Sequence, residues 1–277
     1  TQGGSAEEFA LPALAVGVYL TLAAMTRAEE KTRGRMLGFG AAAGWVFLIK
    51  YTDIGLFVGL GVCLLAFVWR REGVGRALLA AGRMLLGAAL VCAPVAAYLA
   101  VNGALGACVE VYFVQNLFDY SGMPMSLTGH VYNALAYLRT QSVINPAVTV
   151  LVALGAGFVL LDAAKRHERG WFWQALALPM GAGLLVLTCY WGEMAHPYYA
   201  LAFAGLCAPG LIPLAWLANR AERRGLFAWT LPMAGVLAVA PTCMGLCRAV
   251  PLMQIRKADM PQTVFAEMMN REGNPTL

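Results

Sequence analysis

The segment Lys50-Tyr51-Thr52-Asp53 places a cation and a carboxylate in one short turn between two apolar stretches. The stretch before it, Met36–Ile49, would span only about 21 Å as a helix, less than the hydrocarbon core of roughly 30 Å. The turn is therefore expected to lie below the membrane surface, where a lysine needs an anion. We expect Lys50, with Asp53 beside it, to bind the phosphate of a lipid-linked substrate. The alternative is that Lys50 extends to the headgroups and pairs with Asp53, three residues further along.

Two adjacent carboxylates, Glu7 and Glu8, stand near the start of the chain, after Gly3 and Gly4. Ser5 and Glu8 have the spacing of a capping box, in which each side chain bonds the other's backbone amide at a helix start. Capping accounts for Glu8 but leaves Glu7 without a structural role. We expect one of the pair to contact substrate or a divalent cation, with pure capping as the alternative.

A third polar group lies in the turn Trp191–Tyr198, where Glu193 and His196 stand among aromatic residues that include Tyr199. The acid and the imidazole could accept a proton, contact phosphate or supply one ligand to a metal. Tyrosine and tryptophan are also enriched at membrane interfaces, which is the simpler interpretation of the rings. One Glu-x-x-His does not make a metal site, and no metal centre is expected from it alone.

The composition shows which kind of element must position these groups. Apolar residues make up 60% of the 277-residue chain and charged residues 13%, against about 45–50% and 25% in soluble domains. This excludes an ordinary soluble enzyme, a disordered chain and a nucleic-acid-binding protein. The seven cysteines form no CxxC pair, and most lie within apolar runs where a thiol acts as a small hydrophobe. We therefore expect an all-α, polytopic membrane helix bundle.

Spans of about 20 apolar residues can cross a bilayer as helices, and the sequence predicts about eight of them. They form a partial transmembrane domain over residues 1–247, and residues 248–277 are expected to begin an extracytoplasmic tail. The chain starts at Thr1 without a methionine and ends in a polar stretch, so we expect a piece of a longer protein. The predicted spans are Phe9–Thr26, Met36–Ile49, Ile54–Trp69, Ala77–Val101, Pro146–Ala163, Trp171–Tyr190, Tyr199–Leu217 and Leu226–Cys247.

Basic residues are concentrated in alternate loops, which predicts the orientation of the spans. Thirteen lie in one set of loops, whereas the opposite loops between spans hold only Lys50 and Arg139. The first set is therefore expected to be cytoplasmic, and both ends of the chain to lie on the outer side of the cell membrane. The thirteen are Arg27, Lys31, Arg33, Arg35, Arg70, Arg71, Arg76, Lys165, Arg166, Arg169, Arg220, Arg223 and Arg224.

The outer loop 102–145 is long enough to contain structure of its own. Within it, Leu127–Gln141 has the pattern of an amphipathic helix, which we expect to lie in the membrane interface. The segment Val109–Asp119 combines aromatic rings with amides and carboxylates, a mixture that suits sugar recognition and interfacial packing equally well.

Several of these segments resemble a known family in the order in which they occur. Gly3–Pro12 resembles the Gly-Asn-x-Thr-Glu-Glu-x-x-x-Leu-Pro stretch of bacterial multi-spanning C-type glycosyltransferases, relatives of protein O-mannosyltransferases and of the aminoarabinose transferases of lipid A. Ser5-Ala6 departs from the family, which has Asn and Thr there. Leu48–Asp53 resembles its short helix–Lys–helix hairpin, and His196–Leu201 its outer aromatic turn. Met260–Leu277 is similar to its extracytoplasmic tail.

The resemblance implies transfer of a sugar from a polyprenyl-phosphate carrier to a glycan, lipid or protein acceptor on the outer face. The family's catalytic Asp lies in an outer loop near the N-terminus that nothing here matches, so the catalytic residue is expected outside this piece, which alone should be inactive. The substrate-binding residues expected here are Glu7, Glu8, Lys50, Asp53, Glu193, His196, Tyr198 and Tyr199. Two other functions stay open: a secondary transporter or lipid flippase, and a non-catalytic membrane scaffold.

Overall fold

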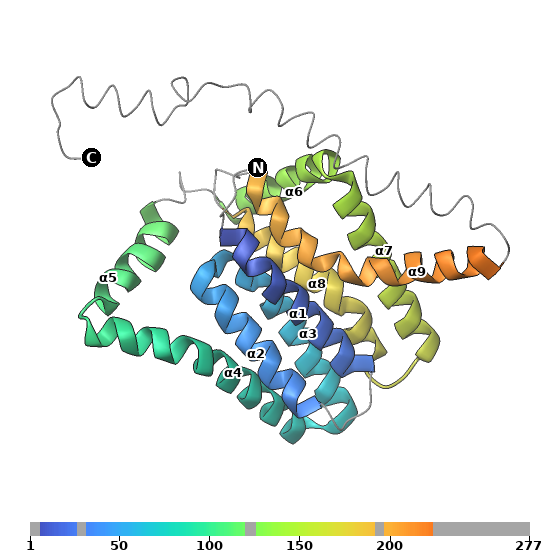
Figure 1. Cartoon of the computed structure of the whole chain (residues 1–277), viewed down its shortest axis with the longest axis horizontal. Coiled ribbons are helices and arrows are strands. Elements are labelled where there is room, and N and C mark those ends of the chain that lie inside the picture. Colours follow the sequence, from blue (N-terminus) through green and yellow to red (C-terminus); the bar gives the residue numbers. More distant parts are fainter. Residues whose placement is uncertain (1–5, 27–31, 120–125, 192–196, 224–277) are drawn as a thin grey trace. The chain divides into compact units, whose positions relative to one another are not determined.

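A computed structural model describes residues 6–26, 32–119, 126–191 and 197–223, and every element in these ranges is a helix (Figure 1). The chain divides into two units, residues 2–219 and a second unit of residue 1 with residues 220–277. Of the second unit, only the last residues of helix α9 are described.

Five helices in the described ranges are long and apolar enough to cross a membrane. An all-helical, membrane-embedded protein is therefore supported, and these helices account for five of the eight predicted spans. They are α1 (Ala6–Thr26), α3 (Ile54–Glu72), α4 (Val74–Val101), α7 (Pro146–Arg166) and α8 (Trp171–Cys189).

The other three predicted spans have different outcomes. The second is α2 (Thr32–Ile49), whose 18 residues extend about 27 Å, so it is longer than expected. Arg33 and Arg35 in its first turn lower its hydropathy. The seventh is interrupted at Cys207, between the 3₁₀ helix η4 (Pro197–Leu206) and α9 (Ala208–Arg223). The eighth, Leu226–Cys247, and the tail 248–277 lie outside the described residues.

Glycines allow two pairs of helices to pack with their backbones close together. Gly40 and Gly44 on α2 lie against α4, where a Cβ built on Gly44 would lie 2.9 Å from the Ala88 carbonyl oxygen. Gly55 and Gly59 on α3 lie against α8 in the same way. Small residues four apart are a common way to bring membrane helices together. We call these contacts the glycine seams.

The core lies where α1, α3 and α8 meet, and Leu14, Leu56, Leu60 and Leu185 are completely buried there. Helix α4 is different, because only Ala80, Met84 and Gly87 of its 28 residues are buried. Most of its exposed residues are apolar, among them Leu78, Leu85 and Leu90, and in a membrane protein such a surface faces lipid.

Contacts between distant residues define two ends of this bundle. At one end, Trp45 donates a hydrogen bond to the Phe9 carbonyl, and Cys189 donates one to Asp53. At the other end, Arg35 donates to the Ala23 carbonyl, and Arg71 pairs with Glu168 at 3.2 Å. We call these the Lys50 end and the Arg71 end.

The long loop 102–145 contains three helices in its described part. They are α5 (Leu105–Val109), a π-helix η3 (Glu110–Asp119) and α6 (Leu127–Ile144). The side chain of Ser126 caps α6 by accepting a hydrogen bond from the Gly129 amide at 3.2 Å, which explains where the helix begins. The helix predicted over Leu127–Gln141 is therefore confirmed.

Candidate functional site

The Lys50–Asp53 turn forms because α2 ends one residue before the lysine. Lys50 has an extended backbone, with φ −154° and ψ 93°, and the next three residues form the short 3₁₀ helix η2 (Tyr51–Asp53). The Asp53 amide donates to the Lys50 carbonyl at 3.0 Å. The hydrogen bonds between backbone groups within the turn are local, because the Lys50 amide also donates to the Val46 carbonyl at 2.7 Å.

Tyr112, from η3, holds the turn from outside. Its hydroxyl accepts a hydrogen bond from the Tyr51 amide at 3.2 Å and donates toward the Phe47 carbonyl at 3.0 Å. The Tyr51 and Tyr112 rings meet edge to face, with centroids 5.4 Å apart. One phenol therefore satisfies backbone groups on both sides of Lys50 and attaches the long loop to the end of α2.

Asp53 is completely buried, which is unusual for a carboxylate. One of its oxygens, Oδ1, accepts a hydrogen bond from the Cys189 thiol of α8 at 3.2 Å. The other, Oδ2, has no hydrogen-bond partner in the part of the chain that the structure describes. A buried polar atom of this kind destabilises the fold unless something else satisfies it, so the site has capacity to bind a polar group.

The Lys50 ammonium is buried as well, and Nζ lies 3.7 Å from the centre of the Tyr199 ring in η4. A cation over an aromatic face is attracted by the negative potential of the ring. Burial lowers the pKa of Lys50, and the neighbouring Asp53 carboxylate opposes that shift. The turn thus places a lysine side chain inside the protein, although α2 is longer than the sequence predicts.

Tyr190, the residue after α8, completes the site with aromatic surface. It is 1% exposed, and its ring lies between those of Tyr137, Tyr199 and Phe203, with centroid distances of 5.6, 6.0 and 6.2 Å. Its hydroxyl makes no hydrogen bond with any described residue. Two buried oxygens, on Asp53 and Tyr190, therefore lack partners in a site that also holds an ammonium group.

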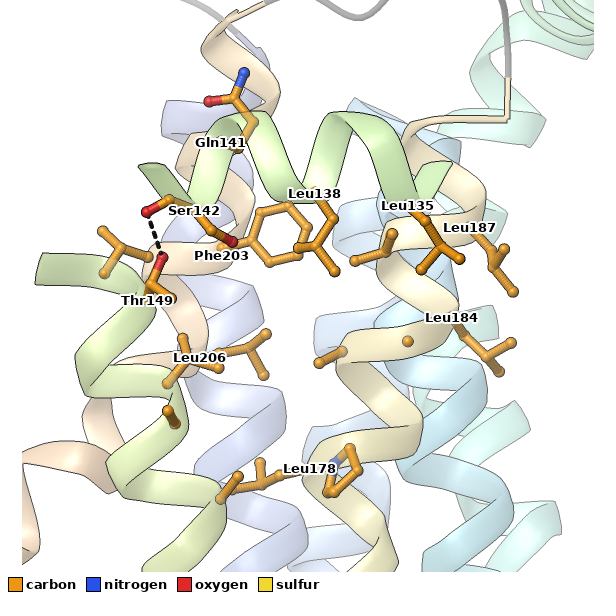
Figure 2. A pocket seen from close by; sticks show the side chains of 18 of the residues that line it. Leu135, Leu138, Gln141, Ser142, Thr149, Leu178, Leu184, Leu187, Phe203 and Leu206 are labelled. Atoms are coloured by element: carbon orange, nitrogen blue, oxygen red, sulfur yellow. Dashed lines mark hydrogen bonds between the residues drawn. The ribbon is translucent and has the colours of Figure 1, made fainter. Parts of the chain in front are cut away.

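A groove of about 750 Å³ adjoins this site (Figure 2). Its walls are α6, α7, α8 and η4, and Figure 2 shows leucines from three of these elements directed into it. Phe203 lines the groove and also stacks on Tyr190. A series of ring contacts thus leads from the groove wall through Tyr190 and Tyr199 to Lys50.

The groove is polar at one end only. Gln141, Ser142, Asn145 and Thr149 line it where α6 gives way to α7, and Thr149 donates to the Ser142 carbonyl at 3.3 Å (Figure 2). The remaining wall is almost entirely apolar. Such a groove suits a hydrocarbon chain with a polar group at one end.

The structure brings together Lys50, Asp53 and Tyr199 from the predicted set. Glu8 is exposed in the first turn of α1, whose start lies at the same end because Phe9 contacts Trp45 of α2. Glu7 and Tyr198 belong to α1 and η4, but their side chains lie outside the described part, as do Glu193 and His196. The structure therefore leaves these four side chains as predictions.

Four residues of the site were not among those predicted from the sequence: Tyr112, Tyr137, Cys189 and Tyr190. Tyr112 lies in the aromatic segment Val109–Asp119, but nothing in the sequence indicates that it reaches Tyr51. Cys189 lies in an apolar run like the other cysteines, and its contact with Asp53 joins residues far apart in the chain. The only local signal was the clustering of tyrosines after α8.

A metal centre finds no support among the described side chains, where no three His, Cys, Asp or Glu residues come together. At the Lys50 site the ammonium would also repel a divalent cation placed beside Asp53.

Comparisons with protein-family models, curated proteins and solved structures found no match for this chain.

The chemistry available at the site follows from its parts. The ammonium can attract an anionic group, and the aromatic rings can stack on a sugar ring or exclude water. Because the site is buried, a charge interaction there is stronger than it would be in water. These groups give this end of the bundle the means to attract an anion.

Proposed function

We propose that this chain is part of an integral-membrane glycosyltransferase that takes a sugar from a polyprenyl-phosphate carrier and transfers it to an acceptor on the outer face. The main support is the buried Lys50 ammonium, which lies over Tyr199 and beside Asp53. A cation in this position can bind the carrier's phosphate and stabilise the negative charge that grows on it as the sugar leaves.

The groove provides a place for the rest of the carrier. An isoprenoid tail is a long hydrocarbon, and the groove offers an apolar channel of about 750 Å³ next to Tyr190 and Phe203. With the tail in the groove and the phosphate at Lys50, the sugar would face the aromatic residues of the Lys50 end. The eight-span topology, the outer location of this end and the role of Glu7 and Glu8 belong to the same proposal.

Photo-crosslinking tests the proposal directly. The purified chain in detergent micelles is irradiated with a polyprenyl phosphate that carries a diazirine in its tail, and labelled peptides are identified by mass spectrometry. We expect labelling on α6, α7 and α8, reduced about tenfold by Lys50→Ala. Lys165→Ala removes the same charge from an exposed position in the last turn of α7 and should label like wild type. Equal labelling of the two variants would mean that Lys50 does not bind the phosphate of the carrier.

A secondary transporter or lipid flippase is the second candidate, and the burial of Asp53 favours it. Ionisable groups buried within membrane bundles often mark the pathway of a substrate or proton. This function predicts counterflow of a radiolabelled solute or lipid in proteoliposomes that is lost in Asp53→Asn. An absence of counterflow, together with crosslinking of the polyprenyl phosphate, would favour the glycosyltransferase.

A further inference from the structure

A second cavity, of about 410 Å³, lies at the Arg71 end, far along the helices from Lys50. It opens where α1 and α7 end and α8 begins, with the first part of α9 forming the remaining wall. Its size falls within the range of roughly 300–1,000 Å³ typical of ligand pockets. No residue of this cavity takes part in the function proposed above.

One side of the cavity carries both signs of charge. Asp162 and Arg166 lie one helical turn apart on α7, and the Arg166 Nε lies 3.0 Å from the Asp162 Oδ2. The pair is only partly exposed, with 29% of the aspartate side chain and 45% of the arginine side chain accessible. Arg166 uses only its Nε in this contact, so the outer nitrogens of its planar guanidinium are directed elsewhere and can bind phosphate oxygens.

Gln174 of α8 lines the same cavity and is 5% exposed. Its side-chain amide has both a donor and an acceptor. An amide in a cavity wall can bind a polar ligand that enters the cavity. Gln174 therefore gives the cavity a polar group besides the ion pair on α7.

The remaining walls are mostly apolar, and they include Val18 and Leu22 of α1 and Ile212 of α9. Tyr19 and Thr26 of α1 also line the cavity. Apolar walls below a charged rim, at the ends of membrane-crossing helices, match the part of a bilayer where headgroups meet acyl chains. A soluble metabolite would gain little from these walls, whereas the first methylenes of a lipid would bury against them.

We propose that this cavity binds the headgroup of a phospholipid that carries both a phosphate and a primary ammonium, as phosphatidylethanolamine does. The phosphate lies against Arg166 and the Gln174 amide, and the ammonium lies against Asp162. An anionic lipid without an ammonium would leave Asp162 facing negative charge, which disfavours it. The bound lipid then bridges α1, α7 and α8 at the Arg71 end.

Thermal unfolding of the whole chain in detergent micelles tests the assignment. Phosphatidylethanolamine and phosphatidylglycerol with the same acyl chains are added separately, and the unfolding midpoint is measured for each. We expect phosphatidylethanolamine to raise the midpoint by several degrees more than phosphatidylglycerol. Asp162→Asn should remove that preference, and Arg166→Gln should reduce the shift from both lipids by at least half. Gln174→Met, of similar volume, should also reduce it.

Arg71→Gln is the matched control, because it breaks a comparable exposed ion pair with Glu168 at the same end but outside the cavity. This variant should keep the full shift and the full preference. The proposal is overturned if wild type does not distinguish the two lipids, or if Arg71→Gln loses as much as Arg166→Gln. It is also overturned if soluble phosphoethanolamine gives the same shift as the lipid. Should Gln174→Met fail to fold, the two α7 variants decide the matter.

Discussion

A single hydroxyl group, that of Tyr112, holds the backbone of the Lys50 site in place. It bonds to the Tyr51 amide and to the Phe47 carbonyl, which lie 61 and 65 residues before it in the chain. The Phe47 carbonyl lies in the last turn of α2, where the helix leaves carbonyl groups without a partner, and the Tyr51 amide lies at the start of η2. The phenol therefore fixes the backbone on either side of Lys50 and, through it, the direction of the ammonium.

Tyr112→Phe should lower the unfolding free energy by about 1–2 kcal/mol, because it removes two hydrogen bonds and leaves the ring in place. The measurement is thermal or denaturant unfolding in detergent micelles. Tyr132→Phe is the control, because Tyr132 is 77% exposed on α6. Equal effects of the two variants would mean that the Tyr112 hydroxyl contributes nothing to the turn.

The Cys189 thiol donates a hydrogen bond to one carboxylate oxygen of Asp53. Replacing Cys189 should therefore show how much this bond contributes to the stability of the fold. Cys189→Ser keeps a donor and should cost less than about 1 kcal/mol, whereas Cys189→Val leaves both oxygens of Asp53 without a partner from the described chain and should cost about 1–3 kcal/mol. Unfolding midpoints of the two variants measure the difference. A valine variant as stable as the serine variant would contradict the role of the thiol.

At the level of helices, the glycine seams determine which pairs are close. Gly87 on α4 packs against the backbone of α2, where a Cβ would collide with the Leu37 carbonyl oxygen, whereas Gly82 on the same helix has nothing within 4 Å of a built Cβ. These two glycines lie five residues apart, and their surroundings are opposite.

Alanine substitutions at these two glycines should therefore change stability in opposite directions. Gly82→Ala should stabilise by about 0.5–1 kcal/mol, because alanine favours a helix more than glycine does. Gly87→Ala should destabilise by about 1–3 kcal/mol, because the added methyl group overpacks the seam. Unfolding in the same detergent measures both. A stabilising effect of Gly87→Ala would show that α2 and α4 are not in backbone contact.

Helix positions were easier to predict from the sequence than helix partners. Apolar runs bounded by charges located α1, α3, α4, α7 and α8 to within a few residues. The length of α2 was underestimated because its first turn carries arginines, and hydropathy does not register that a polar turn can still be helical. The interruption at Cys207 was not anticipated, because the apolar run continues through it.

Part of the candidate site was also accessible from the sequence. A lysine and an aspartate between apolar runs identified the turn, since such residues are rare there without a purpose. The contacts from Tyr112, Tyr137 and Cys189 join segments that are distant in the chain. No local pattern encodes such pairings, because they result from how the helices pack.

For the molecule as a whole, the distribution of basic residues predicts which end faces the cytoplasm. Arg35, Arg71 and Arg166 lie at the Arg71 end, so that end should be inside and the Lys50 end outside. In this orientation the Lys50 site faces outward, as the proposed sugar transfer requires. In the opposite orientation the cavity at the Arg71 end would face outward instead.

Cysteine labelling in intact cells measures this orientation. In a background without native cysteines, Thr128→Cys at the start of α6 should react with a membrane-impermeant maleimide added outside. Glu72→Cys at the end of α3 should react only after the membrane is permeabilised. Both positions are exposed, so access to the reagent decides the result. The reverse pattern would place Lys50 in the cytosol and contradict the proposed outer-face reaction.

The glycine seams also determine where this protein can flex. Helices whose backbones interlock cannot slide apart without losing many contacts together, so α2 with α4, and α3 with α8, should move as rigid pairs. Both cavities border α7, which is tied by close glycine contacts to α9 through Gly155 and Gly210. Because α7 belongs to neither glycine seam, we expect a displacement that admits a long hydrocarbon to the groove to involve α7 and to leave the two seams intact.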